Sequence, residues 1–235
     1  MADSRKHRGP HPADADLFEP TLWPTLRTAV GELCWLLDRG YAIPSSLKLV
    51  GDRHTLQERQ RTAVKRSACT SEALKLRGQK CMPLSDAREV WIDGFNLLTT
   101  IEAALGGGVI LIGRDGCCRD MASMHGTYRK VEETRPALEL VGTQLSAHGV
   151  AKANWLLDQP VSNSGRLAGI IRDIAAEHGW DWEVDVVRDP DPVLSQHEGV
   201  VVSADSEILN RCQQWANVAA EIVAKVPDAC VVQMC

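Results

Sequence analysis

Long apolar segments are missing from this sequence. No apolar run is long enough to cross a membrane, and residues 1–16 are polar, without the apolar core of a signal peptide. The 235 residues are 44% hydrophobic and 24% charged, as in an ordinary globular protein, and can form one large domain or two unequal ones. We therefore expect a cytoplasmic protein with no membrane partner and a flexible tail over residues 1–20.

Paired cysteine motifs are also missing. None of the eight cysteines belongs to a C-x₂-C pair, and no histidines stand near them at zinc-finger spacing. Free thiols in apolar segments behave as small hydrophobic side chains. We expect free structural thiols rather than a disulfide framework or a zinc site. An RNA-recognition pattern of aromatic residues is absent too, so base-specific readout is not predicted.

Charge is distributed unevenly, although the net charge is only −5. Residues 1–38 carry four Lys/Arg and six Asp/Glu, residues 39–80 carry ten and three, and residues 81–235 carry twelve and twenty-two. A segment of net charge +7 beside one of −10 predicts an anionic partner for the first and a cation for the second. A homo-oligomer is compatible with the sequence, which does not itself predict one.

The basic segment has the pattern of a small helical module, residues 21–82. Apolar residues recur with helical spacing over residues 22–38, and Gly40 follows as a terminating residue. Residues 44–46 predict a turn, and a second helix is expected over residues 55–67.

The rest of the chain, residues 86–235, alternates short apolar runs with longer amphipathic ones. This alternation predicts an α/β fold with a parallel sheet covered by helices on both faces. Strands are expected at Glu89–Ile92, Val109–Ile112, Ala153–Leu157, Trp182–Val187, Gly199–Val202 and Ala229–Gln233. Helical segments are expected at Asn96–Leu105, in a broken stretch over Cys118–Ala147, at Gly165–His178 and at Ser206–Lys225.

Three of the expected strands are followed by an aspartate, namely Asp93, Asp158 and Asp205. The carboxyl ends of parallel strands meet at one edge of the sheet, where ligands bind in open α/β folds. Converging carboxylates repel one another unless a cation is present, and Mg²⁺ or Mn²⁺ prefers oxygen ligands. The alternative interpretation is that each aspartate only caps the helix that follows it. Taken together, the three favour a metal site that acts on phosphate.

Three segments carry a resemblance to a known family. Trp91–Leu98, which contains Asp93-Gly94-Phe95-Asn96, resembles the first motif of NYN-type ribonucleases, members of the PIN-like nuclease superfamily. Val201–Ile208, which contains Ser203-Ala204-Asp205, resembles their late motif, and Leu157-Asp158 their intermediate strand-end acid. The complete chain also resembles an uncharacterised prokaryotic family in which a basic helical module precedes a PIN-like domain.

The resemblance implies a Rossmann-like domain that hydrolyses RNA phosphodiester bonds with Mg²⁺ or Mn²⁺. It implies that Asp93, Asp158 and Asp205 hold the metal and orient the attacking water. Asn96 and Ser203 would bind a metal-bound water or the scissile phosphate. In-line attack would leave a 5′-phosphate and a 3′-hydroxyl.

The family usually has one further acid on an intervening helix. Candidates here are Asp115, Asp120, Glu132 and Glu133, of which we favour Asp120, with Asp115 next. The alternative is that these acids form surface salt bridges with nearby arginines. His125 lies in a second polar cluster and is a candidate general acid, although a surface or capping histidine is the commoner case.

Basic residues in both parts of the chain are candidates for binding RNA or phosphate. In the helical module the candidate RNA footprint comprises Arg53, Arg59, Arg61, Lys65, Arg66, Lys75, Arg77 and Lys80. Downstream, Arg114, Arg129, Lys130 and Arg166 are further candidates for holding phosphate, the last at a loop that enters a helix.

The sequence thus predicts a metal-dependent ribonuclease whose basic module positions structured RNA. A non-catalytic RNA-binding or adaptor protein on a degenerate nuclease scaffold and a small-molecule phosphoesterase are the alternatives.

Overall fold

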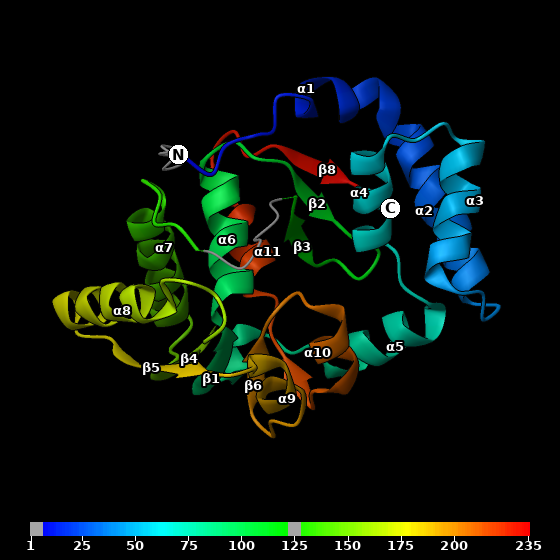
Figure 1. The fold of residues 1–235 in the computed structure, drawn as a ribbon. Coiled ribbons are helices and arrows are strands. Elements are labelled where there is room, and N and C mark those ends of the chain that lie inside the picture. Colours follow the sequence, from blue (N-terminus) through cyan, green and yellow to red (C-terminus); the bar gives the residue numbers. More distant parts are fainter. Residues whose placement is uncertain (1–6, 122–127) are drawn as a thin grey trace.

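The computed structural model describes residues 7–121 and 128–235, and its centre is a five-stranded, all-parallel sheet (Figure 1). The strand order is β5-β4-β1-β6-β7. The strands are β1 (Glu89–Asp93), β4 (Lys152–Asp158), β5 (Asp181–Val187), β6 (Val200–Val202) and β7 (Gln214–Trp215). The chain first adds strands on one side of β1 and then returns to its other side with β6, the arrangement of a Rossmann-like α/β domain. The predicted fold class is therefore confirmed.

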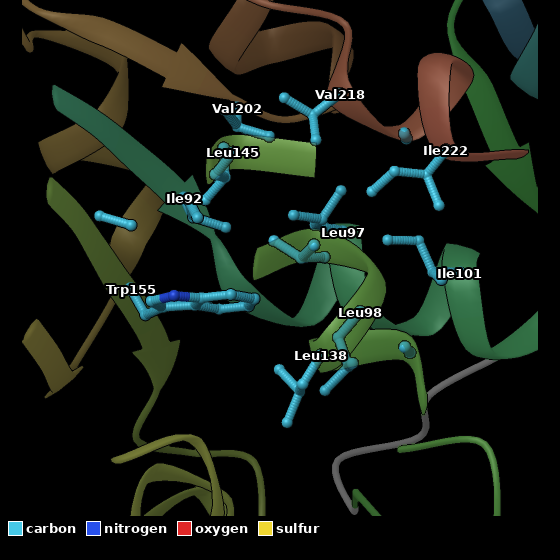
Figure 2. Packing of buried hydrophobic residues seen from close by; sticks show 14 of the residues in the cluster. Ile92, Leu97, Leu98, Ile101, Leu138, Leu145, Trp155, Val202, Val218 and Ile222 are labelled. Atoms are coloured by element: carbon cyan, nitrogen blue, oxygen red, sulfur yellow. The ribbon is translucent and has the colours of Figure 1, made fainter. Parts of the chain in front are cut away.

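Helices cover both faces of this sheet because consecutive side chains of its central strands, which point to opposite faces, are apolar. Ile92 and Trp155 point into the larger core, against Leu97 and Leu98 of the next helix (Figure 2). Leu156 and Val201 point the other way, into a smaller cluster. The larger core is made by α6 (Gly94–Leu105), α7 (Thr134–Ala147), α8 (Ser164–His178) and α11 (Val218–Val223), and the smaller one by α9 (Pro190–Ser195) and α10 (Ser206–Arg211).

Two expected strands lie outside the main sheet. Strand β2 (Ile110–Ile112) pairs antiparallel with β3 (Cys118–Asp120) and parallel with β8 (Val231–Gln233) to form a second sheet. The expectation of a helix beginning at Cys118 is therefore wrong, and the expected helix over 206–225 is interrupted by β7. Strand β3 pairs with β2, the strand before it, and β7 pairs with β6. Both are too short for a periodicity in the sequence to reveal them.

The basic segment forms a helical module, as predicted, with more helices than expected. It contains α1 (Asp14–Leu17), η1 (Pro20–Leu22), α2 (Trp23–Leu37), α3 (Ile43–Arg53), α4 (Glu58–Ser67) and α5 (Ser71–Lys80), and η2 (Leu84–Asp86) follows. The expected turn at 44–46 is instead the first turn of α3, because proline is tolerated at the start of a helix.

The module shares a core with the second sheet, against which it packs. Leu26, Leu33 and Val64 of the helices lie in one apolar cluster with Leu111 of β2 and Val232 of β8. Module and sheet domain are therefore joined by buried apolar contacts as well as by the chain.

The segment expected to be a flexible tail makes specific contacts from His7 onward. The Arg8 guanidinium lies 2.5 Å from the Glu102 carboxylate, which is fully buried in α6. Asp14 is also buried and pairs with Arg59 of α4. Buried charges require such partners, so residues 7–20 are anchored to both parts of the protein.

Across the described ranges 7–121 and 128–235, no helix is both long and apolar enough to cross a membrane.

Candidate active site

The three predicted strand-end aspartates follow neighbouring strands, because β4, β1 and β6 lie side by side at the centre of the sheet. Asp93 of β1 lies beside Ser203, the residue after β6, and Asp158 lies roughly 7 Å further along the strand direction on β4. Strand alternation places Asp93 and Asp158 on the sheet face covered by α9 and α10, and Asp205 lies beyond the end of β6 as the N-cap of α10. Strands β1 and β6 flank the point where the strand order reverses, the usual binding crevice of such folds.

Asp93 is the most perturbed carboxylate of this edge. It is only 7% exposed, and burial raises its pKa to about 7. A 2.7 Å hydrogen bond from Ser203 Oγ lowers that pKa, whereas the charges of Asp191, Asp205 and Asp158 raise it further. Asp93 precedes α6 but makes no capping hydrogen bond with its side chain, so the capping interpretation does not apply here. A buried carboxylate surrounded by like charges marks a functional site more often than a structural one.

Asn96 and Ser203 hold two loops of the edge together. The Asn96 carbonyl Oδ1 accepts a 2.9 Å hydrogen bond from the Ala204 backbone N–H. Ser203 Oγ donates to Asp93 and accepts from the Asp205 backbone N–H at 2.9 Å. These bonds fix the turn after β6 against the start of α6, so the predicted residues Asp93, Asn96, Ser203 and Asp205 are brought together.

Asp205 does cap a helix. Its Oδ1 accepts hydrogen bonds from the backbone N–H groups of Glu207 and Ile208, at 2.7 and 3.3 Å, and so begins α10. A carboxylate has two oxygens, and these bonds occupy one of them. Asp205 can therefore cap α10 and still present Oδ2 to a ligand.

Asp191 joins this group, and the sequence analysis did not identify it. It is exposed in the first turn of α9, and its charge is the strongest carboxylate contribution to the raised pKa of Asp93. Partial burial and the charges of Asp205, Asp189 and Asp158 raise the pKa of Asp191 itself. The available signal was Asp189-Pro190-Asp191, directly after the strand at 181–187, where an N-cap and a proline begin a helix.

A cleft of about 940 Å³ opens between this edge and the helical module. Asp93, Asn96, Asp191 and Asp205 line one wall, from the sheet domain. Lys65 and Arg66, at the end of α4, line the other wall together with residues of α5 and of the turn after α2. The cleft thus places the acidic wall opposite Lys65 and Arg66, while Arg77 and Arg119, which also line it, form ion pairs with Asp115.

Asp120, the favoured fourth acid, also lines the cleft, but at a different position. Its Oδ2 accepts hydrogen bonds from Thr99 and Thr100 of α6, at 3.3 and 3.2 Å. These threonines follow Asp93 by six and seven residues, which corresponds to about 10 Å along the helix axis. Arg66 donates to the Asp120 backbone carbonyl and lies 3.9 Å from the carboxylate. Asp120 is therefore placed to orient Arg66 rather than to join Asp93.

Asp115, the other favoured candidate, is a structural residue. Its carboxylate is 2% exposed and forms ion pairs with Arg77 of α5 and Arg119 of β3. Burial alone would raise its pKa, but hydrogen bonds and charge from the two arginines lower it to about 2. The prediction that Asp115 holds a metal is therefore corrected, because its oxygens are already bound by guanidinium groups.

Asp158 and the downstream acids are less central. Asp158 is half-buried, its pKa is raised by burial and by the charge of Asp189, and it is not one of the residues found to line the cleft. Glu133 binds His7 and Arg8 of the N-terminal segment, and Glu132 faces His7 at 3.6 Å. His125 lies outside the described residues.

Most of the predicted phosphate-binding cations contact acids of the chain itself. Arg53 pairs with Glu32, Arg59 with Asp14 and Arg61 with Asp52. Arg114 holds Ser71 and the Cys69 carbonyl, next to Asp38. Arg129, Lys130 and Arg166 are exposed and are not among the residues that line the cleft. Three of the predicted cations line the cleft, namely Lys65, Arg66 and Arg77, and Arg77 is bound by Asp115 and Asn210. The others, Arg53, Arg59, Arg61, Lys75, Lys80, Arg114, Arg129, Lys130 and Arg166, are not among the lining residues.

The donor atoms of the acidic wall are all oxygens, apart from one amide nitrogen, which suits a hard divalent cation. In the part of the chain that the structure describes, no three His, Cys, Asp or Glu side chains lie close enough together to hold an ion as they stand.

Fold and site define an α/β protein with an acidic cluster at the carboxyl edge of its sheet, facing a basic helical module. The chain belongs to the family described as "Domain of unknown function (DUF5616)", whose model matches residues 84–221. Residues 25–80 match a second model, "Protein of unknown function (DUF434)". The two matches meet between the end of α5 and η2.

A relative is the uncharacterized protein MJ0935 of Methanocaldococcus jannaschii. It is 30% identical over 187 residues, which cover 79% of this chain and 89% of that protein. No solved structure matches the chain.

Proposed function

We propose that this protein is a Mg²⁺- or Mn²⁺-dependent ribonuclease that cleaves RNA in the cleft between the sheet domain and the helical module. The observation that carries the proposal is that one cleft is lined by acids and by cations. The acids are the buried Asp93 with Asp191 and Asp205, and the cations are Lys65 and Arg66. The resemblance of Trp91–Leu98 and Val201–Ile208 to NYN-type ribonucleases supports the same reaction. A cytoplasmic location, where structured RNA is abundant, belongs to the proposal.

The acidic wall would hold the metal. Asp93 and Asp205 are the first candidates, Asp191 replaces Asp115 and Asp120 as the further acid, and Asp158 lies at the periphery. A bound divalent ion supplies charge stabilisation on phosphoryl oxygens and lowers the pKa of water. The raised pKa of Asp93 fits this role, because a nearby cation favours the charged carboxylate that burial disfavours.

Asn96 and Ser203 would act as positioning residues. Ser203 directs one oxygen of Asp93 by its 2.7 Å hydrogen bond, and Asn96 fixes the turn that carries Asp205. Because Asn96 Oδ1 is engaged by Ala204, its amide N–H₂ is the group that remains as a donor toward phosphate.

The basic wall would hold the RNA backbone. Lys65 is exposed and Arg66 is half-buried in the last turn of α4. Cations at this end of a helix interact favourably with the helix dipole. Arg66 is held by Asp120, so it can meet phosphate with little loss of side-chain freedom. The ion pairs of Arg53, Arg59 and Arg61 argue against a broad RNA footprint across the module.

The test compares cleavage of a labelled RNA panel in Mn²⁺ by the wild type and by Asp93→Asn, Asp191→Asn and Asp205→Asn. Asparagine keeps the hydrogen bond from Ser203 at position 93 and caps α10 at position 205, so these variants remove charge without removing local structure. We expect losses of about 100-fold or more for the variants at 93 and 205. Asp173→Asn, an exposed acid on α8, is the matched control.

Mn²⁺ binding, measured by calorimetry without RNA, gives an independent readout. Cleavage that is equal in wild type and Asp93→Asn contradicts the proposal. So does a complete lack of cleavage by wild type across the panel.

The second candidate is a non-catalytic RNA-binding protein. It is favoured by the spacing of the acids, since no three metal-ligating side chains among the described residues are close enough to hold an ion as they stand. Salt-sensitive RNA binding without cleavage and without Mn²⁺ binding would select it. Hydrolysis of small phosphoesters but not of RNA would select a phosphoesterase.

A further inference from the structure

The cleft has an apolar end whose residues have no role in the proposed cleavage. Tyr41 and Ile43, which lie at the turn from α2 into α3, both line it and are 58% and 43% exposed. Leu37 and Gly40 line the same end. Gly40 has a φ of +79°, a conformation that glycine adopts easily, and the Tyr41 N–H donates to the Leu36 carbonyl. The turn is thus ordered, although its large side chains are not buried.

A series of contacts connects this turn to the acidic wall. Asp38, at the end of α2, accepts hydrogen bonds from the backbone N–H and the hydroxyl of Ser71, at 2.6 and 2.7 Å, which fixes the turn to the start of α5. Near the other end of α5, Arg77 donates to the Asn210 side chain and Lys80 donates to the Asn210 backbone carbonyl, both at 2.9 Å. Asn210 belongs to α10, the helix that Asp205 begins. The apolar end therefore has a defined position relative to the acids.

The same cleft contains Lys65 and Arg66. A groove that combines cations with an exposed aromatic ring is the usual arrangement for single-stranded nucleic acid, whose phosphates and base faces are both accessible. An apolar pocket for a protein segment would not require the cations, and a duplex would not use the ring, since both faces of each paired base are covered by stacking.

We propose that Tyr41 is the stacking platform of a nucleobase subsite, with Ile43 and Leu37 beside it, and that Lys65 and Arg66 hold backbone phosphates of the same strand. This rests on the proposed function, because it assumes that the cleft receives RNA. The substrate class is RNA that is unpaired at the point of cleavage, such as a loop or bulge of a structured molecule. The stacking is indifferent to base identity, since every base has a π face.

The test measures binding of a short fluorescent RNA to the full chain by anisotropy in EDTA, where no metal-dependent cleavage occurs. We expect the single strand to bind more tightly than a duplex of the same sequence. Tyr41→Ala should weaken single-strand binding roughly 10- to 100-fold, and Tyr41→Trp should preserve it. Trp35→Ala is the matched control, because Trp35 is an aromatic residue of α2 with 54% exposure that is not found in the lining of the cleft.

A second readout removes bases instead of side chains. Abasic substitutions are moved along the RNA, and one position should weaken binding to the wild type but not to Tyr41→Ala. Unchanged single-strand affinity in Tyr41→Ala, or equal losses in Trp35→Ala, overturns the subsite. Capture of an apolar peptide but not of RNA by the cleft overturns it too.

The outcomes separate this inference from the proposed function. Cleavage that depends on Asp93 but is indifferent to Tyr41 overturns the subsite and leaves the ribonuclease proposal standing. Binding of single strands that depends on Tyr41, with no cleavage, supports the subsite and contradicts the ribonuclease. The absence of any RNA binding overturns both.

Discussion

Asp93 and Asp115 are both buried aspartates, yet their surroundings differ completely. Asp115 lies between Arg77 and Arg119, which lower its pKa to about 2 and tie α5 to β3. Asp93 has a serine as its hydrogen-bond partner and three other aspartates within electrostatic range, and its pKa is raised to about 7. The first carboxylate is compensated within the chain and stabilises the fold. The second carboxylate is surrounded by like charges, and the bound cation that would compensate it is part of our proposal.

The largest effect is expected for Asp115→Asn, which tests whether the ion pairs of Asp115 stabilise the fold. Two buried arginines would lose their counter-charge, so we expect the free energy of unfolding to fall by about 3–5 kcal/mol. Denaturant unfolding followed by circular dichroism measures the change. Asp173→Asn, on the exposed surface of α8, should stay within about 0.5 kcal/mol of wild type. A loss at position 115 no larger than that of the control would show that the ion pairs do not stabilise the fold.

The opposite effect is expected for Asp93→Asn in metal-free buffer at pH 8. The folded-state pKa of Asp93 lies above its unfolded value, so stability falls as the pH rises from about 4, and the full cost is present above about 7. Asparagine removes this cost, and we expect a gain of about 1–4 kcal/mol, because each pKa unit corresponds to about 1.4 kcal/mol. The gain should disappear near pH 4, where wild-type Asp93 is protonated in the folded state. Mn²⁺ should raise the melting temperature of the wild type and not of the variant.

The pH profiles of the two variants sharpen this prediction. Wild-type stability attributable to Asp93 declines as the pH rises from about 4 to 7, whereas that attributable to Asp115 is lost as the pH falls from about 4 to 2. Identical pH dependence of wild type and Asp93→Asn between pH 4 and 8 would contradict the raised pKa.

The smallest change in stability is expected from removing the hydrogen bond that Ser203 donates to Asp93. Ser203→Ala removes the donor to Asp93 and the acceptor for the Asp205 N–H, and we expect a loss of about 1 kcal/mol in stability. Since the Ser203 bond lowers the folded-state pKa of Asp93, its removal should extend the decline of stability to higher pH, with its start near pH 4 unchanged. Ser203→Thr, which keeps the hydroxyl, is the matched control. A pH profile unchanged in Ser203→Ala would mean that Ser203 does not tune Asp93.

Much of the fold follows from residues that are close in sequence. The apolar runs at 89–92, 153–157, 182–187 and 199–202 were expected as strands, and all four lie in the parallel sheet. Strands β3 and β7 were missed, because two or three residues are too few to show a periodicity. The chain from His7 was expected to be flexible, because nothing in its local pattern reveals that Arg8 and Asp14 pair with Glu102 and Arg59.

The candidate site was predicted in part. Asp93, Asn96, Ser203 and Asp205 could be grouped because motifs at strand ends converge in any parallel sheet. Asp191 was not predicted because it lies beyond the end of β5, in the first turn of α9. Asp115 was wrongly predicted to bind metal because its partner Arg77 is 38 residues away in the sequence. Arginines next to one another in the helical module were read as one surface, although each faces a different acid.

The sequence by itself determined the α/β fold class, the basic character of the first part and the carboxylates at the strand ends, since periodicity and composition express local geometry and charge. Only the tertiary structure decided which carboxylates are compensated. Among the described residues, Asp115 forms ion pairs with two arginines and Asp93 with none, because the partners depend on how α5, β3 and α10 pack. Only the tertiary structure, too, placed Lys65, Arg66 and Tyr41 across a cleft from Asp93, since a cleft between two packed parts is a property of neither part alone.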